Sequence, residues 1–225
     1  MKLPPELAWI QNARLPQKET DARLDGATVV VTGATSGVGY AAARRLAEAG
    51  ADLVAVCRNE AKGRALAAEL AEAYGSRVDL VVADFSSLAS VRRAAEEIAA
   101  TWSDVSALVN NVGMHSTSRI LTDEGHELVF CVNHLAPFLL TSLLLPLLRR
   151  NAPARIVDVN SQGHRFGGLD LADVTWEARR YRGIKGYGAS KTAQLHTVWK
   201  FAELLAGSGV TINAMHPGAV RSNIG

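Results

Sequence analysis

Short apolar runs alternate with amphipathic stretches along most of this chain. The first run, 27–32, is rich in β-branched residues and ends in glycines, which is typical of a buried parallel strand. The stretch from Val38 to Ala49 has apolar residues at helical spacing and stops at Gly50, a common residue after a helix end. The same alternation predicts further strands at 52–57, 78–83, 105–110, 155–160 and 210–214, and further helices at about 60–74, 86–101, 121–150 and 187–206.

Six strands separated by helices predict a Rossmann-like, doubly wound parallel β-sheet of the α/β class. Parallel strands need crossover connections, and these connections pack helices on both faces of the sheet. No repeat, linker or low-complexity tract divides the 225 residues, and this length suits one large domain. We therefore expect an N-terminal extension at 1–26 and a single nucleotide-binding domain at 27–225.

Composition and charge exclude several classes of protein. The formal net charge of +2 is small and the basic residues are scattered, so we expect no nucleic-acid partner. Cys57 and Cys131 lie in apolar segments far apart, which indicates buried thiols in a reducing, cytoplasmic compartment. The six histidines show no metal-ligand spacing, so no metal site is expected.

No segment of the sequence predicts a membrane span. The most hydrophobic run, 137–148, is only twelve residues long and contains Pro146. A spanning helix needs about 20 apolar residues, so this run is better interpreted as a buried core helix. The N-terminus has no apolar signal region.

A glycine-rich loop follows the first predicted strand and opens the first predicted helix. Small residues at these positions let the backbone approach a pyrophosphate, whose charge is stabilised by the helix N-terminus. The strand–loop–helix context favours a nucleotide cradle over the alternative, a tight turn without a ligand. The candidate cofactor-binding residues here are Gly33, Thr35, Ser36, Gly37, Val38 and Gly39.

The end of the second predicted strand indicates which nicotinamide cofactor is preferred. NAD-binding sites commonly place a carboxylate there, but this chain has Arg58, nineteen residues after Gly39. An arginine suits a 2′-phosphate, and no carboxylate is present to repel it. We therefore predict NADP(H) in preference to NAD(H); the alternative is that Arg58 is a solvated surface residue.

Tyr187 and Lys191 lie four residues apart, so they share one face of a predicted helix. A free tyrosine has a pKa near ~10, and a neighbouring ammonium group lowers it by favouring the phenolate. The pair is therefore a candidate acid–base device. The alternative is an ordinary solvated helix edge, because such pairs are common.

With these two motifs, Thr-Gly-x-x-x-Gly-x-Gly and Tyr-x-x-x-Lys, the chain resembles the short-chain dehydrogenase/reductase family over about residues 25–225. Other matches follow in the family's order, with Val112 replacing the usual alanine of an Asn-Asn-Ala-Gly motif. The resemblance implies further cofactor contacts from Asp84, Asn110, Gly113, Pro217, Gly218, Val220 and Ser222, besides Tyr187 and Lys191.

The resemblance also implies a catalytic set of Asn133, Ser161, Tyr187 and Lys191. Tyr187 would exchange a proton with the substrate oxygen, and Lys191 would lower the tyrosine pKa and hold the nicotinamide ribose. Ser161 would bind the substrate oxygen, and Asn133 would position a water that connects the lysine to solvent.

The segment 162–186, between Ser161 and Tyr187, is about twice as long as in the most compact family members and rich in glycine, arginine and aromatic residues. Together with Cys57-Arg58-Asn59 and Val132-Asn133-His134-Leu135, this insert makes the chain resemble the retinol-dehydrogenase-like branch, whose members act on bulky apolar alcohols and carbonyls. The expected substrate is therefore a small molecule, an apolar carbonyl compound or a primary or secondary alcohol, although a fold does not fix a function.

Family members usually continue for some tens of residues past the Pro-Gly turn, whereas this sequence stops at Gly225. The sequence is then either a fragment or a protein with an exposed sheet edge, which a partner copy in a homo-oligomer could cover. Two functions follow: an NADP(H)-dependent oxidoreductase, favoured by the complete catalytic set, or a catalytically weak NADP-binding protein that acts through association or cofactor-linked regulation.

Overall fold

The sheet of this protein has six parallel strands in the order β3-β2-β1-β4-β5-β6. The computed structural model describes residues 20–167, 169–218 and 220. The strand order reverses between β1 and β4, so the predicted doubly wound α/β fold is confirmed. The strands are β1 (Thr28–Thr32), β2 (Asp52–Cys57), β3 (Val78–Val82), β4 (Val105–Asn110), β5 (Ala154–Val159) and β6 (Val210–Met215).

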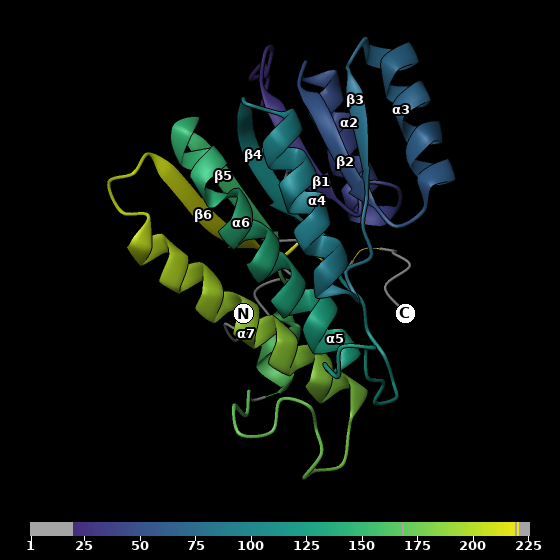
Figure 1. The fold of residues 1–225 in the computed structure, drawn as a ribbon, viewed down its shortest axis with the longest axis vertical. Coiled ribbons are helices and arrows are strands. Elements are labelled where there is room, and N and C mark those ends of the chain that lie inside the picture. The colour runs from purple at the N-terminus through teal and green to yellow at the C-terminus, as the bar shows by residue number, and fades with distance from the viewer. Residues whose placement is uncertain (1–19, 168, 219, 221–225) are drawn as a thin grey trace, which may run out of the picture.

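Helices cover both faces of the sheet (Figure 1). One core cluster joins the sheet to α4, α6 and α7, and a second joins its other face to α2 and α3. The α-helices are α2 (Gly37–Glu48), α3 (Glu60–Tyr74), α4 (Leu88–Thr101), α5 (Leu128–Phe130), α6 (Ala136–Arg150) and α7 (Gly183–Leu204). A π-helical turn, η2 (Cys131–Leu135), joins α5 to α6, and a 3₁₀ turn, η3 (Gln162–Phe166), follows β5.

The apolar runs are continuous because both faces of the central strands are buried. Val30 and Val54 pack into the cluster under α4 and α6, whereas their neighbours Val29 and Leu53 pack into the cluster under α2. Alternate side chains of a strand point to opposite faces, so a strand covered on both sides must be apolar at every position.

Two predicted helix starts are wrong. The helix predicted at 121–150 begins only at Leu128, because Gly125 has φ +83° and Leu121 pairs with Glu127 in an antiparallel bridge. The Glu127 carboxylate then accepts the N–H groups of Val129 and Phe130 and caps the helix. The helix predicted at 187–206 begins earlier, at Gly183.

The helical segment Leu128–Arg150 is long and apolar enough to cross a membrane by length and composition. However, 56% of its most apolar window is buried inside the domain, where it forms the core under the sheet. Core helices of globular proteins commonly show this combination, so the segment is weak evidence for a span.

The predicted extension at 1–26 lies mostly outside the described residues. Residues from Thr20 onward contact the domain, since Leu24 N–H donates to the Ala49 carbonyl (2.8 Å) and Arg23 donates to the Glu48 carbonyl (3.1 Å). The boundary between extension and domain stays a prediction.

Candidate active site

A cleft of about 340 Å³ lies at the carboxyl ends of the strands, where the strand order reverses. Open α/β sheets bind ligands in this crevice because loops from both halves of the sheet meet there. The cleft is lined by Gly33, Ser36, Gly37, Val38, Asn111, Val112, Gly113, Val159, Asn160, Ser161, Tyr187, Lys191, His216, Pro217, Gly218 and Val220.

The loop between β1 and α2 forms one wall of this cleft through its backbone. Gly33 and Gly37 have φ of +68° and +54°, which side-chain-bearing residues rarely adopt. A Cβ at Gly39 would overlap the Gly33 carbonyl oxygen. The N-cap residue Ser36 makes no side-chain bond to the first N–H groups of α2, and a helix start of this kind fits a nucleotide pyrophosphate.

Asn111 holds this loop in place from the neighbouring strand. Its side-chain amide donates to the carbonyls of Thr32 (3.0 Å) and Gly33 (3.3 Å), and its backbone N–H donates to the Thr32 hydroxyl (2.9 Å). Asn111 was not predicted as a site residue. The Asn-Asn pair after β4 could have indicated a role for Asn111. However, its hydrogen-bond partners, Thr32 and Gly33, lie almost eighty positions away in the sequence.

Several predicted cofactor contacts do not line the cleft. Asn110 is buried, and its amide donates to Thr141 (2.9 Å) and Asp158 (2.7 Å). The Asp84 carboxylate accepts the N–H and hydroxyl of Ser86. Thr35 and Gly39 lie beside the lining residues of the glycine loop, and Ser222 lies outside the described residues.

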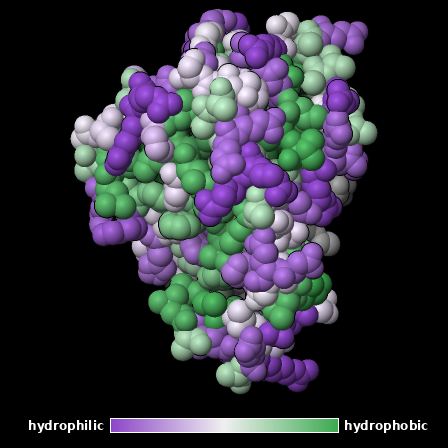
Figure 2. Space-filling model, in the orientation of Figure 1, coloured by the Kyte–Doolittle hydropathy of each residue, from purple (hydrophilic) through white to green (hydrophobic). Residues whose placement is uncertain are grey.

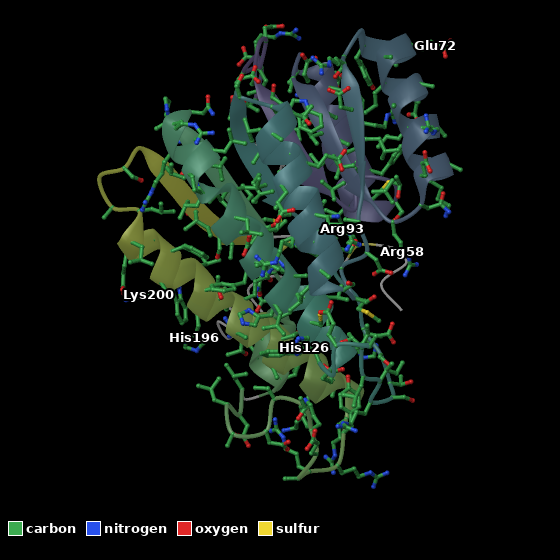
Figure 3. The ribbon with its side chains drawn as sticks, viewed as in Figure 1. Arg58, Glu72, Arg93, His126, His196 and Lys200 are labelled. Carbon is green, nitrogen blue, oxygen red and sulfur yellow. The ribbon has the colours of Figure 1, made fainter. Side chains whose placement is uncertain are left out.

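Arg58 is exposed just after the end of β2, where a 2′-phosphate was predicted to bind (Figure 3). Within the described part of the chain its side chain has no hydrogen bond or ion pair. Its exposure and its place after β2 fit the predicted role, which stays a prediction.

Tyr187, Lys191 and Ser161 are brought together in the cleft. Tyr187 and Lys191 lie one turn apart on α7, with the lysine nitrogen 6.0 Å from the centre of the tyrosine ring. The Ser161 hydroxyl accepts the Gly163 N–H (3.0 Å) and so starts η3. A Cβ at Gly163 would lie 2.6 Å from the tyrosine ring and 3.3 Å from the Ser161 oxygen, so the glycine lets the two side chains approach.

Lys191 is almost fully buried, at 2% exposure. Its ammonium group donates to the Val159 carbonyl (2.8 Å) and to the Gln194 side-chain oxygen (3.2 Å). Burial lowers the lysine pKa to about 8, while the charge of Asp158 opposes that change. An ammonium group has three donors, so one remains for a ligand in the cleft.

Asn133 lies behind the cleft, in the π-helical turn η2. Its oxygen accepts the Met114 N–H (2.8 Å), and its amide donates to the Met114 carbonyl (2.9 Å) and the Ser190 hydroxyl (3.0 Å). These bonds join the loop after β4 to the helix that carries Tyr187 and Lys191. The predicted role of Asn133 as a water-positioning residue is untested.

Three further polar residues were not predicted: Asn160, which lines the cleft, and Asp158 and Gln194, which are buried. Asn160 donates to the Lys191 carbonyl (3.0 Å) and to the Gln194 side chain (2.8 Å), and both residues are buried. Asp158 is a carboxylate inside the apolar strand β5, at 3% exposure. A charged residue in such a strand is itself a signal, because an unpaired charge there would be very unfavourable.

The insert packs against the segment that precedes α5. The Tyr181 hydroxyl donates to the buried Glu127 carboxylate (3.2 Å), and the Arg119 guanidinium donates to the Thr175 carbonyl (2.6 Å). The Arg179 guanidinium lies 3.8 Å above the Trp176 ring. The segment also reaches the start of α7, because a Cβ at Gly186 would lie 2.7 Å from the Tyr181 oxygen.

A second, apolar cavity of about 630 Å³ lies between α6 and α7, near His196 and Lys200 (Figure 3). It contains none of the predicted site residues.

Hydrophobic patches are interspersed with hydrophilic ones over the face shown in Figure 2. Across residues 20–167, 169–218 and 220, no cluster of three or more candidate metal ligands is present.

Comparison with known families gives the same assignment as the site. The family model for short chain dehydrogenases matches residues 27–225. The chain belongs to the short-chain dehydrogenase family. This match confirms the resemblance inferred from the glycine loop and the Tyr187–Lys191 pair.

Several curated relatives place this short-chain dehydrogenase near the retinol-dehydrogenase-like branch. It is 37% identical to human retinol dehydrogenase 13, covering 96% of this chain and 65% of the relative. It is 39% identical to mouse retinol dehydrogenase 12, covering 91% and 65%. It is 40% identical to bovine dehydrogenase/reductase SDR family member 13, covering 97% and 58%. The chain thus spans less than two thirds of the length of these relatives.

Solved structures share the fold of this dehydrogenase. A Mycobacterium paratuberculosis protein aligns with a TM-score of 0.76 at 35% identity, covering 88% of this chain and 70% of that one. The Pseudomonas aeruginosa RhlG/NADP complex aligns with a TM-score of 0.73 at 30% identity, covering 89% and 75%. A Sphingobium yanoikuyae short-chain dehydrogenase in complex with NADPH has the same TM-score and identity, covering 88% and 73%.

Proposed function

We propose that this short-chain dehydrogenase is an NADP(H)-dependent oxidoreductase that interconverts a carbonyl compound and a primary or secondary alcohol. The observation that carries the proposal is one cleft in which Tyr187, Lys191 and Ser161 face the glycine loop. The NADP and NADPH complexes among the solved relatives and the exposed Arg58 support the cofactor preference. The names of the retinol dehydrogenase relatives support an apolar substrate.

Different residues of the chain would have different roles in the proposed reaction. The glycine loop and the start of α2 would hold the pyrophosphate, and Arg58 the 2′-phosphate. The bound nicotinamide supplies or accepts the hydride. Tyr187 would donate a proton to the carbonyl oxygen during reduction and remove it from the alcohol during oxidation. The Lys191 ammonium would stabilise the charge left on the tyrosine oxygen, and Ser161 would orient the substrate oxygen.

The direct test is NADPH oxidation with a panel of aldehydes and ketones, comparing the wild type with Tyr187→Phe. The variant keeps the ring against Gly163 and removes only the hydroxyl, so turnover should fall at least about 100-fold while NADPH affinity stays within about twofold. Near-normal turnover by the variant would refute the role of Tyr187. Saturable NADPH binding without turnover by the wild type would favour the alternative, a cofactor-binding protein that acts through association.

The cellular setting is also a proposal. Cys57 and Cys131 are free and buried, and burial raises the pKa of the Cys131 thiol to about 12. Unpaired buried thiols suit a reducing compartment such as the cytoplasm. A homo-oligomer is compatible with the apolar cavity between α6 and α7.

A further inference from the structure

Gln194 is a buried polar side chain on α7 that the proposed reaction does not use. It is 2% exposed and lies three residues after Lys191. Its side-chain oxygen accepts two hydrogen bonds, from the Lys191 ammonium group (3.2 Å) and from the Asn160 amide (2.8 Å). Across the described residues, its buried amide nitrogen has no partner. A buried donor left unpaired destabilises a fold, so the value of a glutamine at this position lies in its oxygen.

The two bonds also fix which way the Gln194 amide group points. Lys191 and Asn160 both present donors to it, so only the oxygen can face them. With the amide turned over, its own donors would meet two other donors, which is unfavourable. The oxygen is therefore held at one place beside the ammonium group.

Asn160 ties this oxygen to the segment that carries Ser161. It follows the end of β5 and lines the cleft. Its own oxygen accepts the Ser161 N–H (2.7 Å), and its amide donates to the Lys191 carbonyl (3.0 Å) as well as to Gln194. Asn160 and Ser161 follow β5, whereas Lys191 and Gln194 lie on α7, so these bonds set the spacing between the two elements at the cleft.

The Lys191 ammonium group has acceptors on both of these elements. It donates to the Val159 carbonyl at the end of β5 (2.8 Å) and to Gln194 (3.2 Å), so two of its three donors are used. Gly113, in the cleft wall, lies near the same nitrogen, since a Cβ there would come within 3.8 Å of it. The third donor is left for a cofactor hydroxyl in the cleft, and the two acceptors determine where it points.

Several titratable groups lie on the elements around this lysine. They are Asp158 of β5, Tyr187 of α7, His115 of the loop after β4, His134 of η2, His164 of η3 and His216 after β6. Burial lowers the lysine pKa to about 8, and the charge of Asp158 opposes that change. Within the described residues, none of these six side chains is hydrogen-bonded to the ammonium group, whereas Gln194 is.

We propose that Gln194 is a positioning residue for Lys191: its side-chain oxygen, held in place by Asn160, fixes the ammonium group at the wall of the cofactor cleft. The inference rests on the proposed function, in which this ammonium group stabilises charge on the Tyr187 oxygen. An acceptor beside the lysine also favours its charged form, because an ammonium group is a much stronger donor than a neutral amine. Loss of the acceptor should therefore lower the lysine pKa.

The test is an NMR titration of protein that carries ¹³C at the ε-carbon of its lysines. The Lys191 signal is assigned by its absence in Lys191→Arg, and in the wild type it should titrate near pH 8. Gln194→Met keeps the length of the side chain without the oxygen, so the midpoint should move down by roughly one pH unit. Gln194→Glu keeps the oxygen and adds a negative charge, so the midpoint should move up.

The control is Lys200→Met, which places the same new side chain at an exposed position of α7 and should leave the midpoint unchanged. An unchanged Lys191 midpoint in folded Gln194→Met would overturn the inference, because the glutamine would then only fill space. A downward shift in both Gln194 variants would mean a general disturbance of the helix and would overturn it too.

The wild type provides a second reading that decides the question if Gln194→Met does not fold. The side-chain amide signals of Gln194, assigned by their absence in Gln194→Glu, should shift with a midpoint near pH 8, because its oxygen binds the titrating group. Gln194 amide signals that stay constant between about pH 7 and pH 9 would contradict the proposed role.

Kinetics separate this inference from the proposed function. In Gln194→Met, kcat for carbonyl reduction should fall about tenfold, while the KM for the carbonyl compound stays within about twofold. The decline of kcat/KM at high pH should begin about one pH unit lower. Shifted lysine midpoints in a protein that reduces no carbonyl would leave the inference intact and reject the proposed function. Turnover by the wild type together with an unshifted midpoint in Gln194→Met would reject the inference alone.

Discussion

The two halves of the sheet bury different kinds of side chain. In the half built from β1, β2 and β3, the buried polar residues are only Thr28, Thr32 and Ser76 among those described. In the half built from β4, β5 and β6 with α6 and α7, they are Asn110, Glu127, Asn133, Thr141, Asp158, Asn160, Ser190, Lys191 and Gln194. In the proposed function, the first half would meet the cofactor mainly through backbone groups, whereas the second would hold and move protons through its side chains.

The difference explains how each half must be built. A backbone cradle needs close approach and small residues, so its strands can be apolar throughout. A buried side-chain network must satisfy every polar group, because each unpaired one is strongly destabilising. The first half should therefore be sensitive to added volume and the second to changed hydrogen bonding or charge.

The largest effect is expected at Gly39, in the half of the sheet built from β1, β2 and β3, which we call the backbone half. A Cβ there would overlap the Gly33 carbonyl, so Gly39→Val must displace the glycine loop. We expect a loss of roughly 3 kcal/mol in the free energy of unfolding, measured by urea denaturation, and a loss of NADPH binding. Ala41→Val adds the same branched side chain at an exposed position of α2 and should cost less than about 1 kcal/mol.

Arg58→Glu should have the next largest effect. If the guanidinium binds the 2′-phosphate, the variant loses a charge-assisted hydrogen bond worth about 1.5–3 kcal/mol. The ratio of NADPH to NADH affinity should then fall at least about tenfold, measured by fluorescence titration. Arg64→Glu, six residues further along and also exposed, should leave the ratio unchanged. An unaltered ratio in Arg58→Glu would show that Arg58 is a solvated surface residue.

The smallest effect concerns His134. This residue belongs to the half built from β4, β5 and β6 with α6 and α7, which we call the side-chain half, but it lies outside the cleft. It packs against Phe130, at 5.0 Å between ring centres, and burial lowers its pKa to about 4, with a smaller contribution from His196. The unfolded chain binds this proton near pH 6.5 and the folded protein only near pH 4, so folding loses stability as the pH falls through that window.

Relative to His134→Gln, the free energy of unfolding of the wild type should drop by about 2 kcal/mol between pH 7 and pH 5. Urea denaturation of both proteins at the two pH values measures the difference. Turnover at pH 7 should be alike in the two proteins. Parallel pH dependence would mean that His134 is more solvated than its packing indicates.

Local patterns predicted the backbone half better than the side-chain half. The helix predicted at 60–74 coincides with α3, because Asn59 caps its start by accepting the Lys62 N–H and Gly75 ends it with φ of +68°. The start of α5 was missed because apolar spacing before Leu128 continues through a turn that Gly125 and Glu127 define.

The catalytic candidates were predicted by motif, and the structure brings Ser161, Tyr187 and Lys191 together. The supporting contacts could not be predicted, because they join residues far apart in sequence. Asn133 binds Met114, nineteen positions away, and Asn110 binds Asp158, forty-eight positions away. Only the fold brings such partners together, so spacing within one segment carries no sign of them.

The π-helical turn η2 also constrains how this gene can change. It fits one more residue into a helical turn than an α-helix would, between α5 and α6. Removing a single residue from Cys131–Leu135 would restore a regular α-helix and leave the apolar side of α6 facing the sheet. The same deletion would shift Asn133, whose side chain bonds Met114 and Ser190 from within the widened turn. Single-residue deletions in this turn should therefore spare the packing of α6 and disturb the surroundings of the site, and the length of the segment is as much a part of the site as Asn133.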